Sequence, residues 1–208
     1  MPLLTAEASY ALMKKYRVPV VRHGLAKTFA EASFIAENVG FPLVLKIDSA
    51  KIIHKTDVGC VKVVHSHEDL EASYKAVLSN ARKITKEING ILVQQFLKGL
   101  EAITGSAIDP QFGKTLMFGS GGVLTQVFKD VTFRLVPISR HDAESMIDDT
   151  KISQLLNYRG NKVDRNKIIG VLLKLNHLVQ NEDIQEMDIN PLFLTERGAF
   201  AADVRIIK

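Results

Sequence analysis

The sequence Ser49-Ala-Lys-Ile-Ile-His-Lys-Thr-Asp-Val-Gly-Cys-Val61 joins two apolar segments, residues 43–47 and 61–64, that are predicted to be β-strands. Two lysines, Lys51 and Lys55, give this loop positive charge, and Gly59 allows backbone N–H groups to approach a ligand closely. The loop lacks the G-x-x-x-x-G-K-[ST] spacing of a Walker-type phosphate loop. The residues alone therefore support two interpretations about equally, an anion-binding loop and a solvated charged turn.

The segments around this loop predict a small α/β lobe. Thr28 and Glu31 form a capping box at the start of a helix that ends at Gly40, and Ser66 is predicted to cap a helix that follows the loop. Lys46 lies near the end of the strand that leads into the loop, so its ammonium group either reaches solvent or points at a phosphate in a cleft. The alternation of strands and helices is typical of a compact α/β lobe.

Composition limits the class of protein. The chain has 208 residues, enough for one sizeable domain or two small lobes, and its 46% apolar and 24% charged residues exclude a disordered chain. The net charge of +4 comes from scattered residues, so neither a nucleic-acid nor a membrane surface is implied, and no apolar run approaches the ~20 residues of a membrane span. Cys60 is the one cysteine, which excludes an internal disulfide and favours a reducing cytoplasm. The first residues also lack the pattern of a signal peptide.

The middle of the chain predicts a second set of strands. A strand at residues 91–96 includes Gln94 and Gln95 and leads to a turn at Gly99, where backbone groups could meet a nucleobase, although an ordinary strand end is favoured on these residues alone. Further strands are predicted at 100–108 and 114–118, before a glycine cluster at 119–122 that favours a tight bend.

A hairpin is predicted next, from segments 123–128 and 131–137. Arg134 lies inside its second strand, so the guanidinium is either at an exposed edge or directed into a polar cleft. Helices are predicted at 139–149 and 164–180, with a short helix between them.

The C-terminal segment 184–206 predicts a β-hairpin with its turn at 195–198. The turn pairs residue 194 with 199, so Asn190 lies opposite Asp203, where Cβ atoms are about 4.5–5.5 Å apart and two oxygen ligands can share one Mg²⁺. Asp188 points to the same face as Asn190 and lies opposite Arg205. Because Asp and Asn are depleted in strands, a metal site is favoured over a strand with polar surface residues.

In order and spacing, these motifs resemble an ATP-grasp domain, in particular the β subunit of the ADP-forming acetyl-CoA (acyl-CoA) synthetases. The resemblance covers nearly the whole chain. The segments that carry it are S-x-x-I-x-H-K-T-D-x-G from residue 49, Q-Q-F-L-x-G-x-E from 94, G-x-x-x-D-P-x-F-G from 105, F-G-x-G-G from 118, D-x-x-x-R-x-x-P from 130, Tyr158-Arg-Gly160, and Asp188-Ile-Asn-Pro191 with Ala202-Asp203. Each segment is weak alone, but their order is specific.

The resemblance implies an α+β ATP-grasp fold in which two lobes, residues 1–90 with the His54 loop and 91–208 with the hinge and the metal-binding hairpin, enclose a nucleotide. It also implies the reversible reaction acyl-CoA + ADP + phosphate ⇌ carboxylic acid + CoA + ATP, with ATP or ADP and Mg²⁺ as cofactors. In this family the CoA-binding part and the first phosphohistidine belong to an α subunit, and an α2β2 assembly is expected.

The resemblance also implies roles for individual residues. Lys46 and Lys55 would hold nucleotide phosphates; Gln94, with the backbone of Gln95 and Leu97, would form the adenine hinge; Glu101 would meet the ribose hydroxyls; Asn190 and Asp203 would hold Mg²⁺; and Arg134 would stabilise charge on the transferring phosphoryl group. His54 would accept the phosphoryl group from the α-subunit phosphohistidine and pass it to ADP, because imidazole is a good nucleophile and leaving group near pH 7. The other histidines match no motif and are predicted to lie on the surface.

Two positions depart from the family pattern. Cys60 stands where family members often have a second glycine, which would reduce loop flexibility, and Gln126 stands where they often have glutamate, which removes a charge near the phosphate site. The alternatives are the β subunit of a succinyl-CoA synthetase-like ligase and a non-catalytic nucleotide-sensing domain. The Ile-His-Lys-Thr-Asp loop favours the acetyl-CoA type, and the retained set of site residues is evidence against a sensor. The acyl group, the choice of ADP or GDP and the direction of reaction are not determined by the sequence.

Overall fold

The structure is a computed structural model that describes residues 2–52, 54–122, 130–158 and 160–208. These residues form two compact units. The N-terminal unit contains Thr5–Glu7 and Val21–Leu97, and the C-terminal unit contains Ala8–Val20 and Lys98–Lys208 together with the first residues up to Leu4. Within the described ranges, no helix is both long and apolar enough to cross a membrane.

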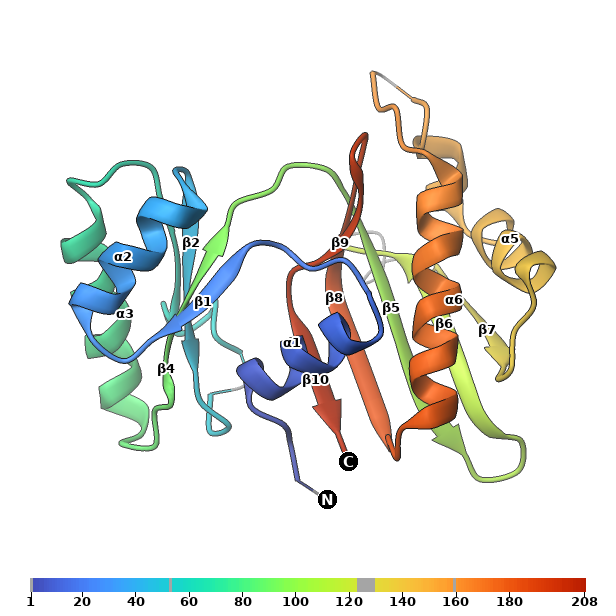
Figure 1. Cartoon of the computed structure of the whole chain (residues 1–208), viewed down its shortest axis with the longest axis horizontal. Coiled ribbons are helices and arrows are strands. Elements are labelled where there is room, and N and C mark those ends of the chain that lie inside the picture. The colour runs from blue at the N-terminus through green and yellow to red at the C-terminus, as the bar shows by residue number, and fades with distance from the viewer. Residues whose placement is uncertain (1, 53, 123–129, 159) are drawn as a thin grey trace. The chain divides into compact units, whose positions relative to one another are not determined.

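The N-terminal unit is an antiparallel four-stranded sheet with two helices on one face (Figure 1). Its strand order is β1 (His23–Ala26), β4 (Gly90–Gln95), β2 (Leu43–Asp48) and β3 (Val61–Val64), and its helices are α2 (Phe29–Val39) and α3 (Leu70–Ile84). The predicted capping box of α2 is half confirmed: the Thr28 hydroxyl accepts a hydrogen bond from the Glu31 N–H at 3.2 Å, but the Glu31 carboxylate accepts from the Lys27 N–H instead of the Thr28 N–H. The second helix begins later than expected, at Leu70, because Ser66 caps only a preceding turn by accepting from the Asp69 N–H.

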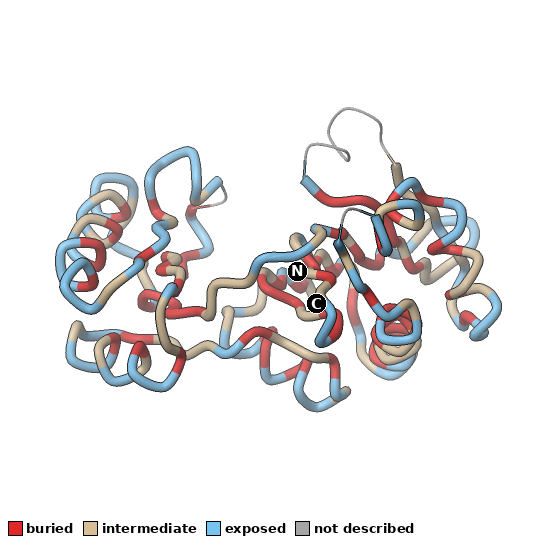
Figure 2. Tube along the Cα trace, turned by 90° about the horizontal axis from the view of Figure 1, so that it is seen from above, coloured by how far each residue is buried: buried red, intermediate tan, exposed pale blue. Residues whose placement is uncertain are grey.

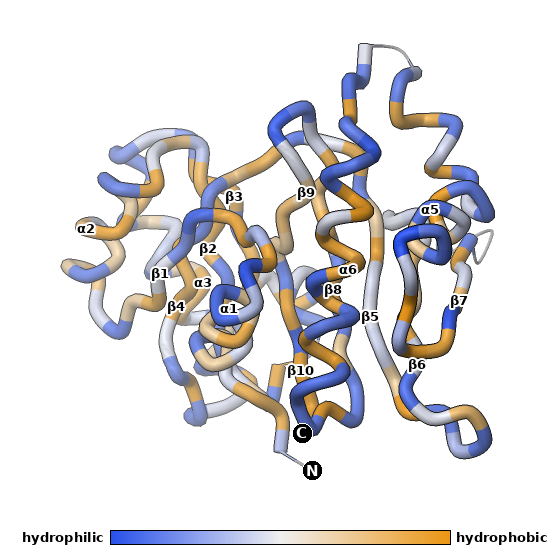
Figure 3. The backbone as a smooth tube through the Cα atoms, turned by 45° about the vertical axis from the view of Figure 1, so that its right-hand side comes forward, coloured by the Kyte–Doolittle hydropathy of each residue, from blue (hydrophilic) through white to orange (hydrophobic). Residues whose placement is uncertain are grey.

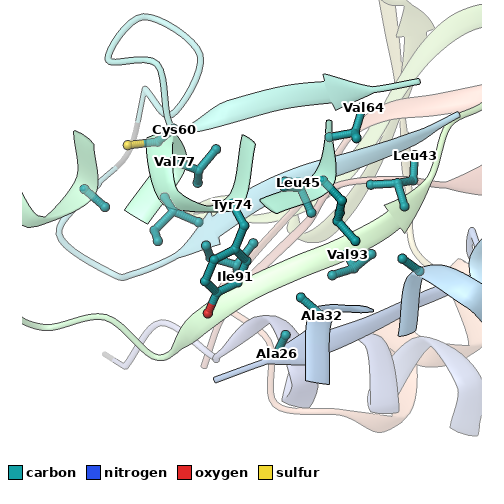
Figure 4. Close-up of a cluster of buried hydrophobic side chains, with 14 of the residues drawn as sticks. Ala26, Ala32, Leu43, Leu45, Cys60, Val64, Tyr74, Val77, Ile91 and Val93 are labelled. Carbon is teal, nitrogen blue, oxygen red and sulfur yellow. The ribbon is translucent and has the colours of Figure 1, made fainter. Parts of the chain in front are cut away.

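The core of this unit lies between the sheet and the two helices. Leu43, Leu45 and Ile47 alternate along β2 and are almost completely buried, and they pack with Val77 and other residues of α3 (Figure 4). The intervening residues of β2, Val44 and Lys46, therefore lie on the face of the sheet away from the helices.

The C-terminal unit is built on a six-stranded antiparallel sheet. Its strands follow the order β10 (Val204–Ile207), β8 (Glu186–Thr195), β5 (Leu100–Asp109), β6 (Gly113–Ser120) and β7 (Val131–Leu135), with β9 (Gly198–Ala201) also paired to β8. The helical segments are α1 (Ala6–Lys15), α5 (Arg140–Asp148), the 3-10 helix Lys151–Leu155 and α6 (Arg165–Asn181). Figure 1 shows α1 and α6 lying across one face of this sheet. The first strand predicted for the 123–137 hairpin falls on 123–128, outside the described residues.

Helix α6 supplies much of the core of the C-terminal unit. Hydrophilic and hydrophobic residues alternate along it (Figure 3), as expected for a helix with one buried face. Its residues Leu172 and Leu175 are buried, as are Leu116 and Phe118 of β6, and Figure 2 shows buried stretches alternating with exposed ones along the trace. The helices predicted to start at 139 and 164 are confirmed, with Ser139 forming a capping box at the start of α5 and Asp164 capping α6.

The two units do not divide at the expected position between residues 90 and 91. Gly90–Gln95 forms β4, an interior strand hydrogen-bonded to β1 and β2, so the N-terminal unit continues to Leu97. Most of the first helix belongs instead to the C-terminal unit, because the Tyr10 hydroxyl donates to the Ala202 carbonyl at 2.9 Å and Lys15 pairs with Glu182 at 2.7 Å. These long-range contacts carry no signal in the local sequence pattern.

Candidate nucleotide and phosphoryl-transfer site

The loop that carries His54 is anchored at both of its ends. At its start, the Ser49 hydroxyl donates to the Glu87 carbonyl at 2.6 Å, and Ile52 is buried in the core. At its end, the Cys60 side chain is completely buried, and its carbonyl accepts from the Ile47 N–H at 3.0 Å. Between these anchors His54 is exposed, so its imidazole is accessible for chemistry.

Gly59 is required by the way the loop closes. Its φ of +66° is in the left-handed region, and a Cβ atom here would lie 2.7 Å from the side-chain nitrogen of Asn80. That same nitrogen donates to the Gly59 carbonyl at 3.1 Å, which ties the loop to α3. Lys55, the other predicted phosphate ligand in the loop, is half-buried, and its carbonyl accepts from the Cys60 N–H at 2.8 Å.

Cys60 fills the core instead of lining a site (Figure 4). Burial raises the pKa of its thiol, so the group stays protonated and unreactive near neutral pH. The departure from a second glycine therefore adds a core side chain that fixes the end of the loop. The other departure, at residue 126, lies outside the described residues.

Lys46 and Gln94 lie on one face of the four-stranded sheet, the face away from α2 and α3. Gln94 pairs with Val44 in the register between β4 and β2, and Lys46 is two residues further along β2. Gln94 is almost completely buried, with 1% of its surface exposed, whereas Lys46 is half-buried. Two residues predicted to bind one nucleotide therefore share one surface.

His23 is a candidate site residue that the sequence analysis placed on the surface. It lies directly opposite Gln94 in the pairing of β1 with β4, and its Nδ1 is 2.8 Å from the Val21 carbonyl. β1 begins at His23, where the sequence analysis predicted no strand. Correct placement of this strand would have aligned His23 with Gln94.

The backbone at the end of β4 differs between the two hinge positions. The Gln95 N–H donates to the Arg22 carbonyl at 2.8 Å, so this donor is already used. Within the described chain, the Leu97 N–H donates to no protein acceptor. Of these two backbone donors, Leu97 is the one available to a ligand such as an adenine ring.

The hairpin register predicted from the C-terminal sequence is confirmed. Leu194 pairs with Ala199 across the turn, and Asp188 pairs with Arg205 further along. The Asn190 N–H donates to the Asp203 carbonyl at 3.2 Å, which places these two residues opposite each other. The pairing is interrupted only between β9 and β10, at residues 202–203, where Asp203 lies.

Strand β8 also pairs with β5, and this pairing contains a β-bulge. Between the pairs Ala102–Leu192 and Thr104–Ile189, β5 has one residue, Ile103, where β8 has two, Asn190 and Pro191. Burial alternates on either side of the bulge, so that Met187 and Ile189 are buried while Asp188 and Asn190 lie on the face away from the helices. The bulge could not be seen from the hairpin sequence because it depends on β5.

The carboxylates near the bulge repel one another. Burial raises the pKa of Asp188, and the negative charges of Asp203 and Glu186 raise it further, against the opposing effect of Arg205. A cation near Asp188 and Asp203 would relieve this repulsion. The available donors are carboxylate and amide oxygens, which suit Mg²⁺, an ion that usually takes only one or two protein carboxylates and completes its shell with water and phosphate oxygens.

The oxygens of Asn190 and Asp203 therefore fit Mg²⁺ as the few protein ligands of a site whose other ligands come from a bound nucleotide. Among the residues that the structure describes, no group of three His, Cys, Asp or Glu side chains is arranged to hold a metal alone. A metal bound here would need ligand oxygens from a nucleotide, as is typical of phosphate-binding magnesium sites.

Glu101 lies on β5 next to the glycine cluster. Its carbonyl accepts from the Gly121 N–H at 2.7 Å, and its carboxylate is exposed. A Cβ atom on Gly121 would lie 2.8 Å from the Glu101 backbone, and one on Gly119 would lie 2.4 Å from the Asp130 carbonyl. Close packing of backbone against backbone explains these glycines, and β6 continues through Gly119 and Ser120, the first half of the segment predicted to bend.

Arg134 lies on a different face from the predicted metal ligands. In the register of β6 with β7 it pairs with the buried Leu116, on the side of the sheet covered by helices. Its guanidinium donates to the Ser145 hydroxyl at 2.7 Å and pairs with Asp149 at 2.6 Å, both at the C-terminal half of α5. The structure thus does not bring Arg134 together with Asn190 and Asp203.

Comparisons with known proteins agree with this architecture. The profile of the ATP-grasp domain family matches residues 2–207. The chain is 41% identical over 206 residues to the β subunit of acetate–CoA ligase [ADP-forming] II from Pyrococcus furiosus, covering 94% of this chain and 87% of that subunit. It is 41% identical over 208 residues to acetate–CoA ligase [ADP-forming] II from Archaeoglobus fulgidus, covering 99% of this chain, and it spans only 30% of the length of that relative.

A solved structure is similarly close. The chain superposes with a TM-score of 0.93 and 42% identity on an acetyl-coenzyme A synthetase from Ca. Korarchaeum cryptofilum, in complex with coenzyme A, Ca-AMPCP and HgCl⁺. The alignment covers 99% of this chain and 93% of that one. The two-unit α+β architecture and the predicted resemblance are therefore confirmed, and the chain belongs to the ATP-grasp domain family.

Proposed function

We propose that this chain is the nucleotide-binding β part of an ADP-forming acetyl-CoA or acyl-CoA ligase, with the overall reaction acyl-CoA + ADP + phosphate ⇌ carboxylic acid + CoA + ATP. The observation that carries the proposal is the exposed His54 on a loop whose two ends are fixed in the core. The 41% identity to a β subunit, of which this chain covers 87%, supports the proposal. Activity requires a CoA-binding α partner, and we propose that this chain and that partner assemble as α2β2.

His54 acts as a phosphoryl carrier in this proposal. An imidazole nitrogen of His54 attacks the phosphorus of a phosphohistidine on the α partner, so that the old N–P bond breaks as the new one forms. A terminal phosphate oxygen of ADP then attacks the phosphorus on His54, which yields ATP and returns the imidazole. Histidine is suited to both steps because neutral imidazole is a nucleophile near pH 7 and a good leaving group from phosphorus.

The nucleotide contacts are assigned residue by residue. Lys46 and Lys55 bind its phosphates, Gln94 and the backbone of Gln95 and Leu97 meet the adenine, and Glu101 binds the ribose. The location of Lys46 and Gln94 on one sheet face, and the available Leu97 N–H, support these assignments. Because the Gln95 N–H is already bonded, Gln95 would contribute through its carbonyl.

Asn190 and Asp203 would hold Mg²⁺ together with phosphate oxygens of the nucleotide. When bound, the metal would neutralise charge that develops on the transferring phosphoryl group. Asp188 lies beside this pair and contributes negative charge to the site. The backbone hydrogen bond between Asn190 and Asp203 keeps the two residues opposite each other.

For Arg134, the contacts favour a supporting role. Its pairing with Asp149 and Ser145 ties the edge strand β7 to α5, which leaves its guanidinium engaged on the helix-covered face. Direct stabilisation of the phosphoryl group would require this pairing to break. We therefore propose that Arg134 positions β7 rather than touching the phosphoryl group.

Phosphohistidine formation tests this function. The chain is mixed with its α partner, acyl-CoA and labelled phosphate, and the acid-labile label on each chain is measured. We expect label on this chain, its loss in His54→Ala, and its retention in His65→Ala, a control at another exposed histidine of the same unit. Labelling that survives in His54→Ala, or label that never leaves the α partner, would contradict the proposal and favour a non-catalytic nucleotide sensor.

A further inference from the structure

A pocket lies on the helix-covered side of the N-terminal unit. It has a volume of about 540 Å³, which is within the roughly 300–1,000 Å³ usual for small-molecule sites. The residues that line it come from the end of β1, from α3 and from the segment leading into β4. They are Lys27, Tyr74, Leu78, Arg82, Lys86, Ile88, Asn89, Gly90 and Ile91.

The rim of this pocket is positively charged. Lys27, Arg82 and Lys86 all line it and are all exposed, and no acidic side chain lines it among the described residues. Within the same part of the chain, none of the three cations forms an ion pair. The carboxylate of Glu31 is engaged by the Lys27 N–H at 2.7 Å. Three unpaired cations around one hollow favour an anionic ligand with more than one charged oxygen.

The floor of the pocket is apolar and aromatic. Tyr74 and Ile91 are buried members of the core cluster, and Figure 4 shows the Tyr74 ring beside Ile91 with its hydroxyl at the outer end. The ring is held edge-on by Phe29, with ring centroids 5.6 Å apart. Burial and then the negative charge of Glu31 raise the pKa of Tyr74, against the opposing charge of Arg82, so both charged groups act near this hydroxyl. A planar or apolar group could rest on this floor while its charged end meets the rim.

From these observations we propose that the pocket binds a small phosphorylated molecule that carries a planar ring. The site is separate from the proposed nucleotide residues of this unit, because Ile91 faces the helices whereas Lys46 and Gln94 lie on the opposite face of the sheet. The inference goes beyond the proposed function and does not depend on it.

The pocket is also connected to the start of the His54 loop. Its wall includes Asn89, whose N–H donates to the Asp48 carbonyl at 2.9 Å and whose side chain donates to the Asp48 carboxylate at 3.3 Å. The neighbouring Glu87 accepts from the Ser49 hydroxyl. The segment that would contact the ligand is thus the segment that holds the loop entry.

Pyridoxal 5′-phosphate is a probe with the proposed chemistry, because it joins a planar ring to a phosphate. Its aldehyde condenses with a lysine amine to an imine and water, and hydride from borohydride reduces the imine to a stable amine. The full chain is labelled briefly, and each modified lysine is quantified by mass spectrometry. We expect Lys27 and Lys86 to react about tenfold faster than Lys75 and Lys83, exposed lysines of α3 that do not line the pocket.

Two controls separate a binding site from simple lysine reactivity. Pyridoxal, which lacks the phosphate, should lose the preference for Lys27 and Lys86. Arg82→Gln should reduce their labelling by pyridoxal 5′-phosphate severalfold, whereas Lys83→Gln, the adjacent exposed cation, should leave it unchanged. The proposal is overturned if both aldehydes give the same lysine pattern, or if Arg82→Gln and Lys83→Gln have the same effect.

Discussion

The hairpin that carries Asn190 and Asp203 and the loop that carries His54 reach their conformations in different ways. The hairpin is ordered by a local turn and by neighbouring strands, since Thr195 pairs with Gly198 and the register continues to Ile207. The loop is ordered by distant residues, Glu87 at its start and Asn80 at its end. Local pairing sets two residues opposite each other, as the proposed metal site needs, whereas anchors at the ends leave the middle of a loop accessible.

The first effect is expected where the hairpin places the proposed metal ligands. Asp203→Ala removes the proposed carboxylate ligand and should raise the Mg²⁺ concentration needed for ADP binding by at least about tenfold, since loss of one charged ligand costs more than roughly 1.4 kcal/mol. Calorimetric titration of nucleotide at several Mg²⁺ concentrations measures this shift. Glu196→Ala, in the turn of the same hairpin, is the control and should leave the requirement unchanged. An unaltered titration in Asp203→Ala would remove the metal assignment.

The next effect tests whether the C-terminal unit, which contains the hairpin, is stabilised by long-range contacts as well as by local strand pairing. Glu182 accepts hydrogen bonds from Lys15 and Tyr16 near the end of α1 and from Lys208 after β10, and these contacts lower its pKa from 4.5 to about 2. Because the folded pKa is lowered, the stabilisation is complete above pH 4.5 and is lost as the pH falls toward 2. Glu182→Gln should therefore lower the unfolding free energy near pH 7 by up to about 3 kcal/mol and flatten its dependence on pH in this window.

Urea unfolding across this pH range measures the contribution of Glu182. Glu68→Gln, at an exposed carboxylate, should retain the wild-type pH profile. If the stability of Glu182→Gln depends on pH as the wild type does, other carboxylates cause the acid dependence. The contacts of Glu182 with α1 and Lys208 then contribute little to stability.

A smaller effect on stability compares Gly59, at the end of the His54 loop, with Gly113, in an ordinary turn. Gly59 and Gly113 both have left-handed backbone angles, with φ of +66° and +81°, so alanine at either position should cost about 1–2 kcal/mol of stability. Gly59→Ala must also displace the Asn80 side chain, whereas Gly113 has no heavy atom within 4 Å of the added Cβ.

We therefore expect Gly59→Ala to be the more destabilising of the two in thermal unfolding, and to speed amide exchange in the His54 loop. Gly113→Ala should leave exchange in that loop unchanged. Equal losses of stability and equal exchange would show that Asn80 does not hold the loop.

The smallest effect has the opposite sign. Burial and the charges of Asp203 and Glu186 raise the pKa of Asp188, so its charged form costs stability above the folded pKa and costs nothing below the ordinary value of 3.8. Asp188→Asn should stabilise the metal-free chain at neutral pH by up to about 1 kcal/mol, and this gain should vanish in acid. Thermal unfolding in the presence of a chelator measures it, and a loss of stability at neutral pH would contradict the repulsion.

Sequence reasoning succeeded where the causes are local. The caps at Thr28, Ser139 and Asp164 depend on side chains that bond within their own turn, and the hairpin register depends on one turn. It failed where distant segments decide. The strand at His23 and the end of the N-terminal unit at Leu97 follow from pairing with β4, which the residues around them do not reveal.

The site shows the same division. By itself, the sequence determined the opposition of Asn190 and Asp203, the position of His54 between two strands and the membership of the chain in the ATP-grasp domain family, because these depend on strand alternation and on the spacing of motifs. Only the tertiary structure decided that Arg134 pairs with Asp149 on the helix-covered face, that β8 is bulged at Asn190 and that Cys60 anchors the loop in the core. Each of these depends on which other strand or helix packs against the residue, and that choice is made by burial across the whole unit.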